Sequence, residues 1–303
     1  MLTRADKESN DSTVENATNS DREEFRYIDG IRFHNVDNAL YPLPNDDEEC
    51  DRLHMQHFIM KNGWQSNFNS PVKHFLTHND SEVLDAGCGA GSWAFDIASS
   101  FPRSKVTGID ISPIQPSGIK PKNFTFIQAN LLDGLPFKDN TFDFIFQRFL
   151  IASIAVDQWP TVMNELIRIL KPGGYLELME FDLRPENLGP VSTRFAEAVI
   201  TLCLQQNCDI NLASTLKSYF EQQNQLKDVK EEIKLFYGGA EAGKLGRAFN
   251  DDVIGFYKNI KVVLMPILQT SSEEYDQMLE TAKKEWLELN SYFHFIRVYA
   301  RKE

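Results

Sequence analysis

Hydrophobic and polar positions change their period several times along the chain. Short runs dense in apolar residues, among them EVLDAG, KVTGIDIS, FTFIQAN, FDFIFQRF and GYLELMEFD, predict buried strands. Between them, SWAFDIASSF and DQWPTVMNELIRIL repeat apolar residues at helical spacing, and Pro172-Gly173-Gly174 is expected to end the second helix. Because strands alternate with helices, we predict a doubly wound, Rossmann-like α/β fold with a mostly parallel sheet.

The same patterns predict that the chain is divided into five parts. The predicted parts are a disordered tail at 1–24, an N-terminal helical lid segment at 25–80, a core at 81–185, a mostly helical cap insertion at 186–290 with one core strand near 228–237, and a final antiparallel strand at 291–303. Within the lid, Asp46 and Glu49 predict a helix with a reciprocal cap that stops at Gly63. The final strand is expected to close the edge of the sheet.

Composition and charge exclude several classes of protein. In 303 residues, 42% are hydrophobic and 12% aromatic, which suffices for a large packed core. The net charge of −13, without a basic cluster, argues against nucleic-acid binding. Four cysteines show neither zinc-site pairing nor the density of a disulfide framework, and no His/Asp/Glu cluster has metal-ligand spacing. No segment approaches the roughly 18 apolar residues of a membrane span, so we expect a soluble intracellular protein.

The stretch VLDAGCGAG, residues 83–91, places three glycines directly after a predicted strand. In a parallel sheet the ligand lies beyond the carboxyl ends of the strands, and glycines let backbone N–H groups approach it closely. Two ligands fit Gly87, Gly89 and Gly91: a dinucleotide or S-adenosylmethionine. GAGSWA also satisfies a loose dinucleotide pattern, so the glycine spacing alone does not discriminate between them.

Two carboxylates accompany the glycines. Asp85 precedes the first glycine by two residues, where it would repel a pyrophosphate and attract a sulfonium and an amino group. Alternatively, Asp85 only caps the loop through backbone hydrogen bonds. Asp110 ends the next strand, 19 residues after Gly91 (110 − 91), where a carboxylate can hold the ribose hydroxyls of either cofactor.

Downstream motifs favour the second ligand. IQANLLDGLPFKDNTFDFIFQRFLI and LIRILKPGGYLELME, together with the glycine loop and Asp110, resemble the class I S-adenosylmethionine-dependent methyltransferases over residues 83–182. The upstream segment YIDGIRFHNVDNALYPLPNDDEECDRLHMQH resembles, more narrowly, the fungal LaeA-like methyltransferases. The resemblance is weakest over the predicted cap.

The resemblance implies roles for individual residues. Gly87, Gly89 and Gly91 would wrap the methionine and ribose of the cofactor, Asp110 would hold the ribose, and Ile111 and Leu131 would line the adenine pocket. Asn130 stands where such families usually carry an aspartate that accepts the adenine amino group, which an amide oxygen can also do. Gln147 would face the methyl group or the cofactor's amino acid, unless it is a solvated strand-end residue.

Tyr41 and Arg52 belong to a segment that folds over the cofactor in the narrower family. Arg52 would then pair with the methionine carboxylate. The preferred alternative is an exposed helix residue paired with Glu48 or Glu49.

The implied reaction is in-line transfer of a methyl group to an O, N or S atom of a small or medium-sized organic acceptor, for which positioning supplies much of the rate. If a general base is needed, the conceivable residues are His34, His57, Glu180 and Tyr237, with His34 the first choice. A structural histidine is nevertheless the preferred interpretation of His34, and Glu180 is expected at the active-site rim. The second hypothesis is a LaeA-like regulatory protein that binds the cofactor and acts through protein partners in control of secondary metabolism. The first implies a cytoplasmic protein and the second allows a nuclear one.

Overall fold

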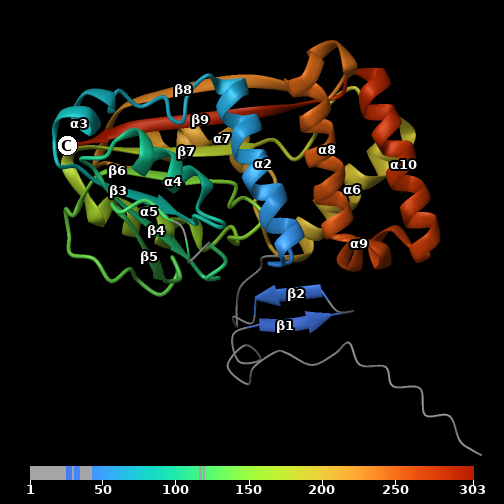
Figure 1. The fold of residues 1–303 in the computed structure, drawn as a ribbon, viewed down its shortest axis with the longest axis horizontal. Helices are drawn as coiled ribbons and strands as arrows, with labels where there is room; N and C mark the ends of the chain where they lie inside the picture. The colour runs from blue at the N-terminus through green and yellow to red at the C-terminus, as the bar shows by residue number, and fades with distance from the viewer. Residues whose placement is uncertain (1–24, 29–30, 35–42, 116–117, 119) are drawn as a thin grey trace, which may run out of the picture.

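The computed structural model describes residues 25–28, 31–34, 43–115, 118 and 120–303, arranged around a seven-stranded sheet (Figure 1). The strands of this sheet are β3 (Glu82–Ala86), β4 (Lys105–Asp110), β5 (Phe124–Gln128), β6 (Phe142–Arg148), β7 (Leu170–Phe181), β8 (Leu226–Tyr237) and β9 (Tyr292–Lys302). Their order is β5-β4-β3-β6-β7-β9-β8, parallel from β5 to β7 and antiparallel on both sides of β9. This confirms the predicted Rossmann-like fold with its antiparallel C-terminal strand. The predicted tail at 1–24 lies outside the described residues.

One expectation about the sheet is wrong: β9 does not close its edge but lies between β7 and β8. The burial of the two strands explains the order. Consecutive residues 295–298 of β9 are all buried, which requires cover on both faces and a neighbour on each side. β8 alternates lysine and glutamate with exposed apolar residues such as Ile233, a composition that suits an edge and discourages pairing with other chains.

The helices complete the fold. They are α2 (Asp47–Trp64), α3 (Lys73–His78), α4 (Ser92–Ser100), α5 (Trp159–Ile169), α6 (Pro190–Gln205), α7 (Leu212–Glu221), the short η1 (Ala240–Ala242), α8 (Gly243–Asn259), α9 (Lys261–Leu268) and α10 (Ser272–Leu289); a hairpin of β1 (Phe25–Ile28) and β2 (Ile31–His34) precedes α2. Helices α6, α8, α9 and α10 gather at one end of the sheet, and α2 packs along α8 (Figure 1). Since β9 begins at that end and runs antiparallel to β7, the helices lie beyond the carboxyl ends of the parallel strands.

Helix α2 begins as predicted but ends later. The Asp46 side chain accepts from the Glu49 backbone N–H at 3.0 Å, whereas the Glu49 carboxylate binds Arg52 and leaves the reciprocal half of the cap unmade. The helix continues through Gly63. A Cβ at this position would lie 2.2 Å from the ring of Phe236, so glycine is what allows α2 to pack against this ring. Sequence alone does not show this long-range contact.

Helix α5 ends before the predicted Pro-Gly-Gly stop. Its last residue is Ile169, and Leu170 already belongs to β7. The reason is Pro172, whose ring disfavours helical backbone at the residue before it, Lys171, so the helix must close earlier.

The Ser271–Glu274 capping box of α10 forms in both directions.

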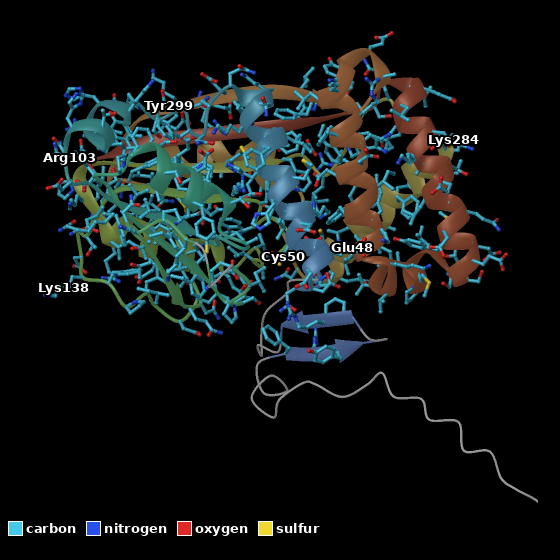
Figure 2. The ribbon with its side chains drawn as sticks, viewed as in Figure 1. Glu48, Cys50, Arg103, Lys138, Lys284 and Tyr299 are labelled. Atoms are coloured by element: carbon cyan, nitrogen blue, oxygen red, sulfur yellow. The ribbon has the colours of Figure 1, made fainter. Side chains whose placement is uncertain are left out.

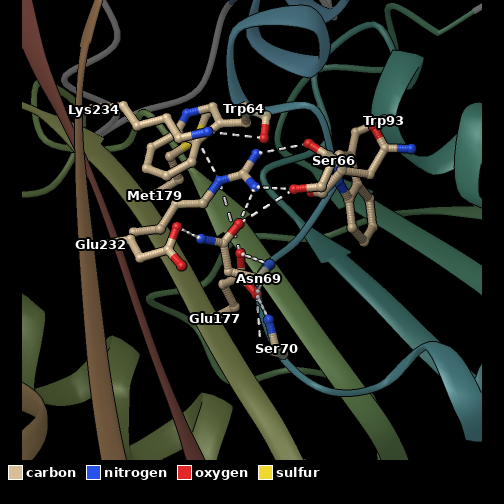
Figure 3. A network of polar contacts seen from close by, with 11 residues as sticks. Trp64, Ser66, Asn69, Ser70, Trp93, Glu177, Met179, Glu232 and Lys234 are labelled. Carbon is tan, nitrogen blue, oxygen red and sulfur yellow. Dashed lines mark hydrogen bonds and ion pairs between the residues drawn. The ribbon is translucent and has the colours of Figure 1, made fainter.

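A buried polar network fastens the segment between α2 and α3 to the sheet (Figure 3). The Glu177 carboxylate on β7 accepts from the backbone N–H groups of Asn69 and Ser70 at 2.8–2.9 Å. Arg297 on β9 donates to the Asn69 side-chain oxygen at 2.7 Å and lies 4.3 Å from the ring centre of Trp64. These contacts anchor the C-terminal end of α2 on β7 and β9.

Candidate functional site

The glycine loop has the backbone that the sequence predicts. Gly87, Gly89 and Gly91 all have φ between +52° and +78°, a region that residues with a Cβ rarely occupy. Gly91 is the N-cap of α4, so free backbone N–H groups at the start of this helix lie next to the loop. A Cβ on Gly87 would approach the Leu150 side chain to 3.1 Å. Close approach of backbone to a ligand is therefore built into the loop.

Asp110, at the end of β4, ties the loop to the sheet. One carboxylate oxygen accepts from the Gly89 backbone N–H at 2.8 Å and the other from the Ser112 N–H at 2.9 Å. A carboxylate can accept about four hydrogen bonds, so capacity remains for ligand hydroxyls. Burial nevertheless raises the pKa of Asp110, and the backbone donors work in the opposite direction. Asp110 both shapes the loop and lines the adjoining cavity.

Asp85 lies on β3 beneath the loop and is not among the residues that line the cavity. Only 2% of its surface is exposed, and its Oδ2 has no hydrogen-bond partner among the described residues. Burial raises the pKa of Asp85 to about 7, while the Arg148 charge and the Ala94 backbone N–H act to lower it. A buried carboxylate with an unused oxygen fits attraction of a nearby cation, and the Ala94 contact fits the alternative of loop capping.

A cavity extends from the glycine loop, and the predicted adenine-site residues line its first part. These are Ile111, Asn130 and Leu131, at the ends of β4 and β5. The Asn130 side-chain oxygen accepts from the Leu132 N–H at 3.0 Å, which folds the turn and leaves its amide group at the cavity wall. The sequence thus brings together side chains that are 20 residues apart.

The far part of the cavity is lined by residues of α6, α8, β7 and β9. Its wall is largely aromatic and aliphatic, with Phe181, Val199, Phe249, Phe256, Tyr257 and Phe295. One continuous space therefore joins the glycine loop to an apolar chamber at the carboxyl ends of the strands, the usual ligand position in an open α/β sheet.

The turn after β6 lines the cavity with residues 148–154. Phe149 has φ of +59°, a costly conformation for a residue with a bulky side chain. Glu180 fixes the turn, because its carboxylate accepts from the Leu150 N–H at 2.9 Å and the Ile151 N–H at 3.3 Å. The strained backbone of Phe149 thus lies at the wall of the cavity.

Glu180 and Gln147 do not lie where the sequence analysis placed them. Both side chains are fully buried, and neither lines the cavity. Gln147 Nε2 donates to Glu180 at 2.7 Å, and burial raises the pKa of Glu180 to about 7. The reason is strand register: both side chains point to the sheet face opposite the one that carries Arg148. Glu180 is thus not at the rim.

The environment of Arg52 does not fully match either of the two predictions. Its side chain is only 9% exposed, pairs with Glu49 at 2.6 Å and reaches across to Asp252 on α8 at 2.7 Å. The pairing with Glu49 was one of the predicted alternatives, but the exposure was not, because the partner on α8 lies 200 residues away in the sequence. Arg52 lines the cavity at the contact between α2 and α8.

Arg148 is a site residue that the sequence analysis missed. It ends β6, lines the cavity and points to the face that carries Asp85. A basic residue in the predicted strand FDFIFQRF was the available signal, but only the register decides on which face it falls.

Two predicted residues cannot be placed. Tyr41 lies outside the described residues, and for His34, at the end of β2, only the backbone is described. Among residues that the structure describes, no group of His, Cys, Asp and Glu side chains is arranged to hold a metal ion. None of the helices in those ranges has both the length and the apolar character needed to cross a bilayer.

Comparison with known families identifies the core. Residues 83–174, which contain the glycine loop, Asp110 and the turn after β6, match the family described as "Methyltransferase domain". Over these residues the chain is similar to methyltransferase domains. The match supports S-adenosylmethionine as its cofactor, in preference to a dinucleotide, and confirms the resemblance drawn from the motifs.

Individual relatives extend the comparison. The chain is 33% identical over 144 residues to the N-methyltransferase verN of Clonostachys rogersoniana, covering 46% of this chain and 50% of that protein. It is 30% identical over 168 residues to the secondary metabolism regulator laeA of Aspergillus fumigatus, covering 55% of this chain and 43% of that protein. The chain spans about half the length of the curated relatives it matches.

Among solved structures, phosphoethanolamine N-methyltransferase 2 of Haemonchus contortus, in complex with S-adenosyl-L-methionine, aligns with a TM-score of 0.49. The alignment has 18% identity and covers 82% of this chain and 57% of the other. A likeness at this level does not establish a shared function.

Proposed function

We propose that this chain is an S-adenosylmethionine-dependent methyltransferase that methylates an O, N or S atom of a small or medium-sized, largely apolar organic acceptor. The observation that carries the proposal is the single cavity that runs from the glycine loop to the aromatic chamber of the cap. A cofactor at the loop and an acceptor in the chamber would share one water-poor space, which the geometry of in-line transfer requires.

The residues at the loop fit the cofactor. Positive φ at the three glycines gives bare backbone for the methionine and ribose, and Asp110 keeps acceptor capacity for the ribose hydroxyls. The Asp85 oxygen that lacks a partner among the described residues would supply negative charge beneath the loop and so attract a sulfonium. Ile111 and Leu131 would enclose the adenine, with Asn130 at its amino group.

When bound, the cofactor would supply an already activated methyl group, with its sulfur as the leaving group, for an acceptor lone pair. The chain's own residues orient the two molecules and exclude water. Glu180 acts in this proposal as a positioning residue, because it holds the turn of residues 149–151 rather than touching the ligand. His34 remains the candidate base for an acceptor that must lose a proton.

The proposed division of labour follows the predicted parts of the chain: 25–80 as lid, 81–185 as cofactor-binding core, 186–290 as acceptor-specific cap carrying β8, and 291–303 as the last core strand. A second candidate function is suggested by the relative named as a secondary metabolism regulator. In that case the chain binds the cofactor and acts mainly through protein partners, in the cytoplasm or the nucleus.

Calorimetry tests the cofactor first. We expect wild-type protein to bind S-adenosylmethionine and not NADH. Asp110→Ala should lose about 1.5 to 3 kcal/mol of binding free energy, because charge-assisted hydrogen bonds to the ribose and to the loop disappear. Asp80→Ala, a carboxylate that is 74% exposed and remote from the loop, should bind like wild type. Equal affinity of the two variants would mean that Asp110 does not hold the ribose.

The acceptor is found with labelled cofactor. Incubation with a crude extract, followed by separation of small molecules from protein, should place label in the small-molecule fraction. Label in neither fraction, despite tight binding of cofactor, would favour the regulatory candidate.

A further inference from the structure

Two arginines line the cavity, and they differ in their partners. Arg52 is held by carboxylates on both sides, Glu49 and Asp252. Arg148 has no carboxylate within 4.0 Å among the described residues. Its polar contact is the His57 Nδ1 atom at 3.4 Å, and its guanidinium lies 5.8 Å from the ring centre of Phe149. Arg148 is therefore a cation at the cavity wall without a close counter-charge.

The groups around Arg148 orient its guanidinium but do not neutralise its charge. His57 is 1% exposed, and its Nε2 lies 3.1 Å from an Asp96 carboxylate oxygen, so this nitrogen carries the proton and Nδ1 is left to accept. Burial lowers the pKa of His57, which keeps the ring neutral and able to accept from a guanidinium. His57 thus orients Arg148 without cancelling its charge.

Longer-range charges do not replace a partner. Asp85 and Asp252 act favourably on Arg148 from a distance, yet burial still lowers its pKa. Arg297 adds a like charge in the neighbourhood. A desolvated cation is costly unless an anion binds it directly, and a guanidinium is shaped to bind a carboxylate through two parallel hydrogen bonds.

We propose that Arg148 anchors a carboxylate of the ligand that occupies this cavity, and that it thereby selects acidic over uncharged ligands. The inference deepens the proposed function and rests on it. Two sources share the chemistry: the methionine carboxylate of the cofactor, which Arg52 is too fully paired to take, and an acid group on an otherwise apolar acceptor.

The test measures binding to wild type, Arg148→Met and Arg148→Lys by calorimetry. The cofactor arm compares S-adenosylmethionine with decarboxylated S-adenosylmethionine, which lacks only the carboxylate. The acceptor arm uses protein saturated with S-adenosylhomocysteine and compares 3-phenylpropanoate with the uncharged 3-phenylpropanamide. Arg103→Met is the matched control, because Arg103 is 59% exposed and lies at the end of the molecule away from α8 (Figure 2).

We expect the wild-type protein to prefer the acid at least 30-fold in one arm, Arg148→Met to lose that preference, Arg148→Lys to keep part of it, and Arg103→Met to match wild type. The arm in which the preference appears identifies the source of the carboxylate. Thermal melts of each variant establish that it is folded. If wild type binds S-adenosylmethionine but Arg148→Met keeps every preference, the anchor is overturned and the cofactor assignment stands. If wild type binds no S-adenosylmethionine, the proposed function fails and the anchor with it.

Discussion

Asp85 shows how a single side chain can couple cofactor binding to pH. Its carboxylate is buried, one oxygen lacks a donor among the described residues, and its pKa is raised from 3.8 to about 7. Ionising such a group costs folding free energy unless a cation comes near. Ionisation of Asp85 should therefore lower the stability of the unliganded protein, and a bound sulfonium should offset this loss.

The stability consequence has a definite sign. Because the folded-state pKa of Asp85 lies above its unfolded value, wild-type stability falls as pH rises from about 3.8 to about 7 and is level above that range. Asp85→Asn removes the loss, so at pH 8 we expect the variant to be more stable than wild type by roughly 4 kcal/mol, and at pH 4 to be nearly equal. Urea unfolding at both pH values measures the difference. A variant less stable than wild type at pH 8 would show that the carboxylate acts through ionic contacts.

The affinity for the cofactor should depend on pH in the opposite direction to stability. A bound cation lowers the pKa of Asp85, so the affinity of wild type for S-adenosylmethionine should rise between pH 6 and pH 8 by up to about tenfold in total, and level off above pH 7. Asp85→Asn should not share this rise, and the ratio of the two affinities cancels the titration of the cofactor's own amino group. Calorimetry at the two pH values gives the ratio. A constant ratio would leave Asp85 as a loop cap only.

In β6 and β7, the face of the sheet on which a side chain lies decides whether it lines the cavity. In β6, Gln147 and Arg148 are neighbours in sequence, yet one points to the buried side of the sheet and the other lines the cavity. The sequence predicted the strand and the turn after it. It did not predict the faces, because a shift of register by one residue exchanges them.

The carboxylate of Glu180 on β7 holds the strained turn after β6. Glu180→Ala leaves two backbone N–H groups and the Gln147 amide without an acceptor, each costing about 1–3 kcal/mol when buried. We expect a loss of at least about 2 kcal/mol in stability and faster hydrogen exchange at the amides of Leu150 and Ile151. Glu186→Ala, a glutamate that is 53% exposed, should change stability by less than about 0.5 kcal/mol. Unchanged exchange in Glu180→Ala would contradict the positioning role and return the residue to consideration as a base.

At the scale of the whole molecule, local patterns were predictable and long-range partners were not. The glycine loop, Asp110, the antiparallel last strand and the helical cap follow from residues close together in the sequence. The place of β9 between β7 and β8, the continuation of α2 past Gly63 and the partner of Arg52 depend on contacts between distant segments. Periodicity carries no information about such contacts, so these three errors fall where segments distant in the sequence meet.

The contact between lid and cap gives a final prediction. Arg52 on α2 binds Asp252 on α8 beside the cavity, and both side chains are less than 10% exposed. Glu48 and Lys258 join the same two helices, but these side chains are 64% and 57% exposed. Buried and solvated ion pairs between the same elements can therefore be compared directly.

Removing the buried partner should loosen the lid. Asp252→Ala leaves Arg52 with Glu49, so we expect a stability loss of about 1 to 3 kcal/mol rather than the full penalty of an isolated buried charge. Release of S-adenosylhomocysteine, followed by stopped flow, should be about tenfold faster, a change of about 1.4 kcal/mol in the barrier, because α2 and α8 separate more readily over the cavity. Lys258→Ala should change stability by less than about 1 kcal/mol and leave release unchanged, since a solvated pair contributes little. If the two variants release ligand at the same rate, the Arg52–Asp252 pair stabilises the fold without closing the cavity.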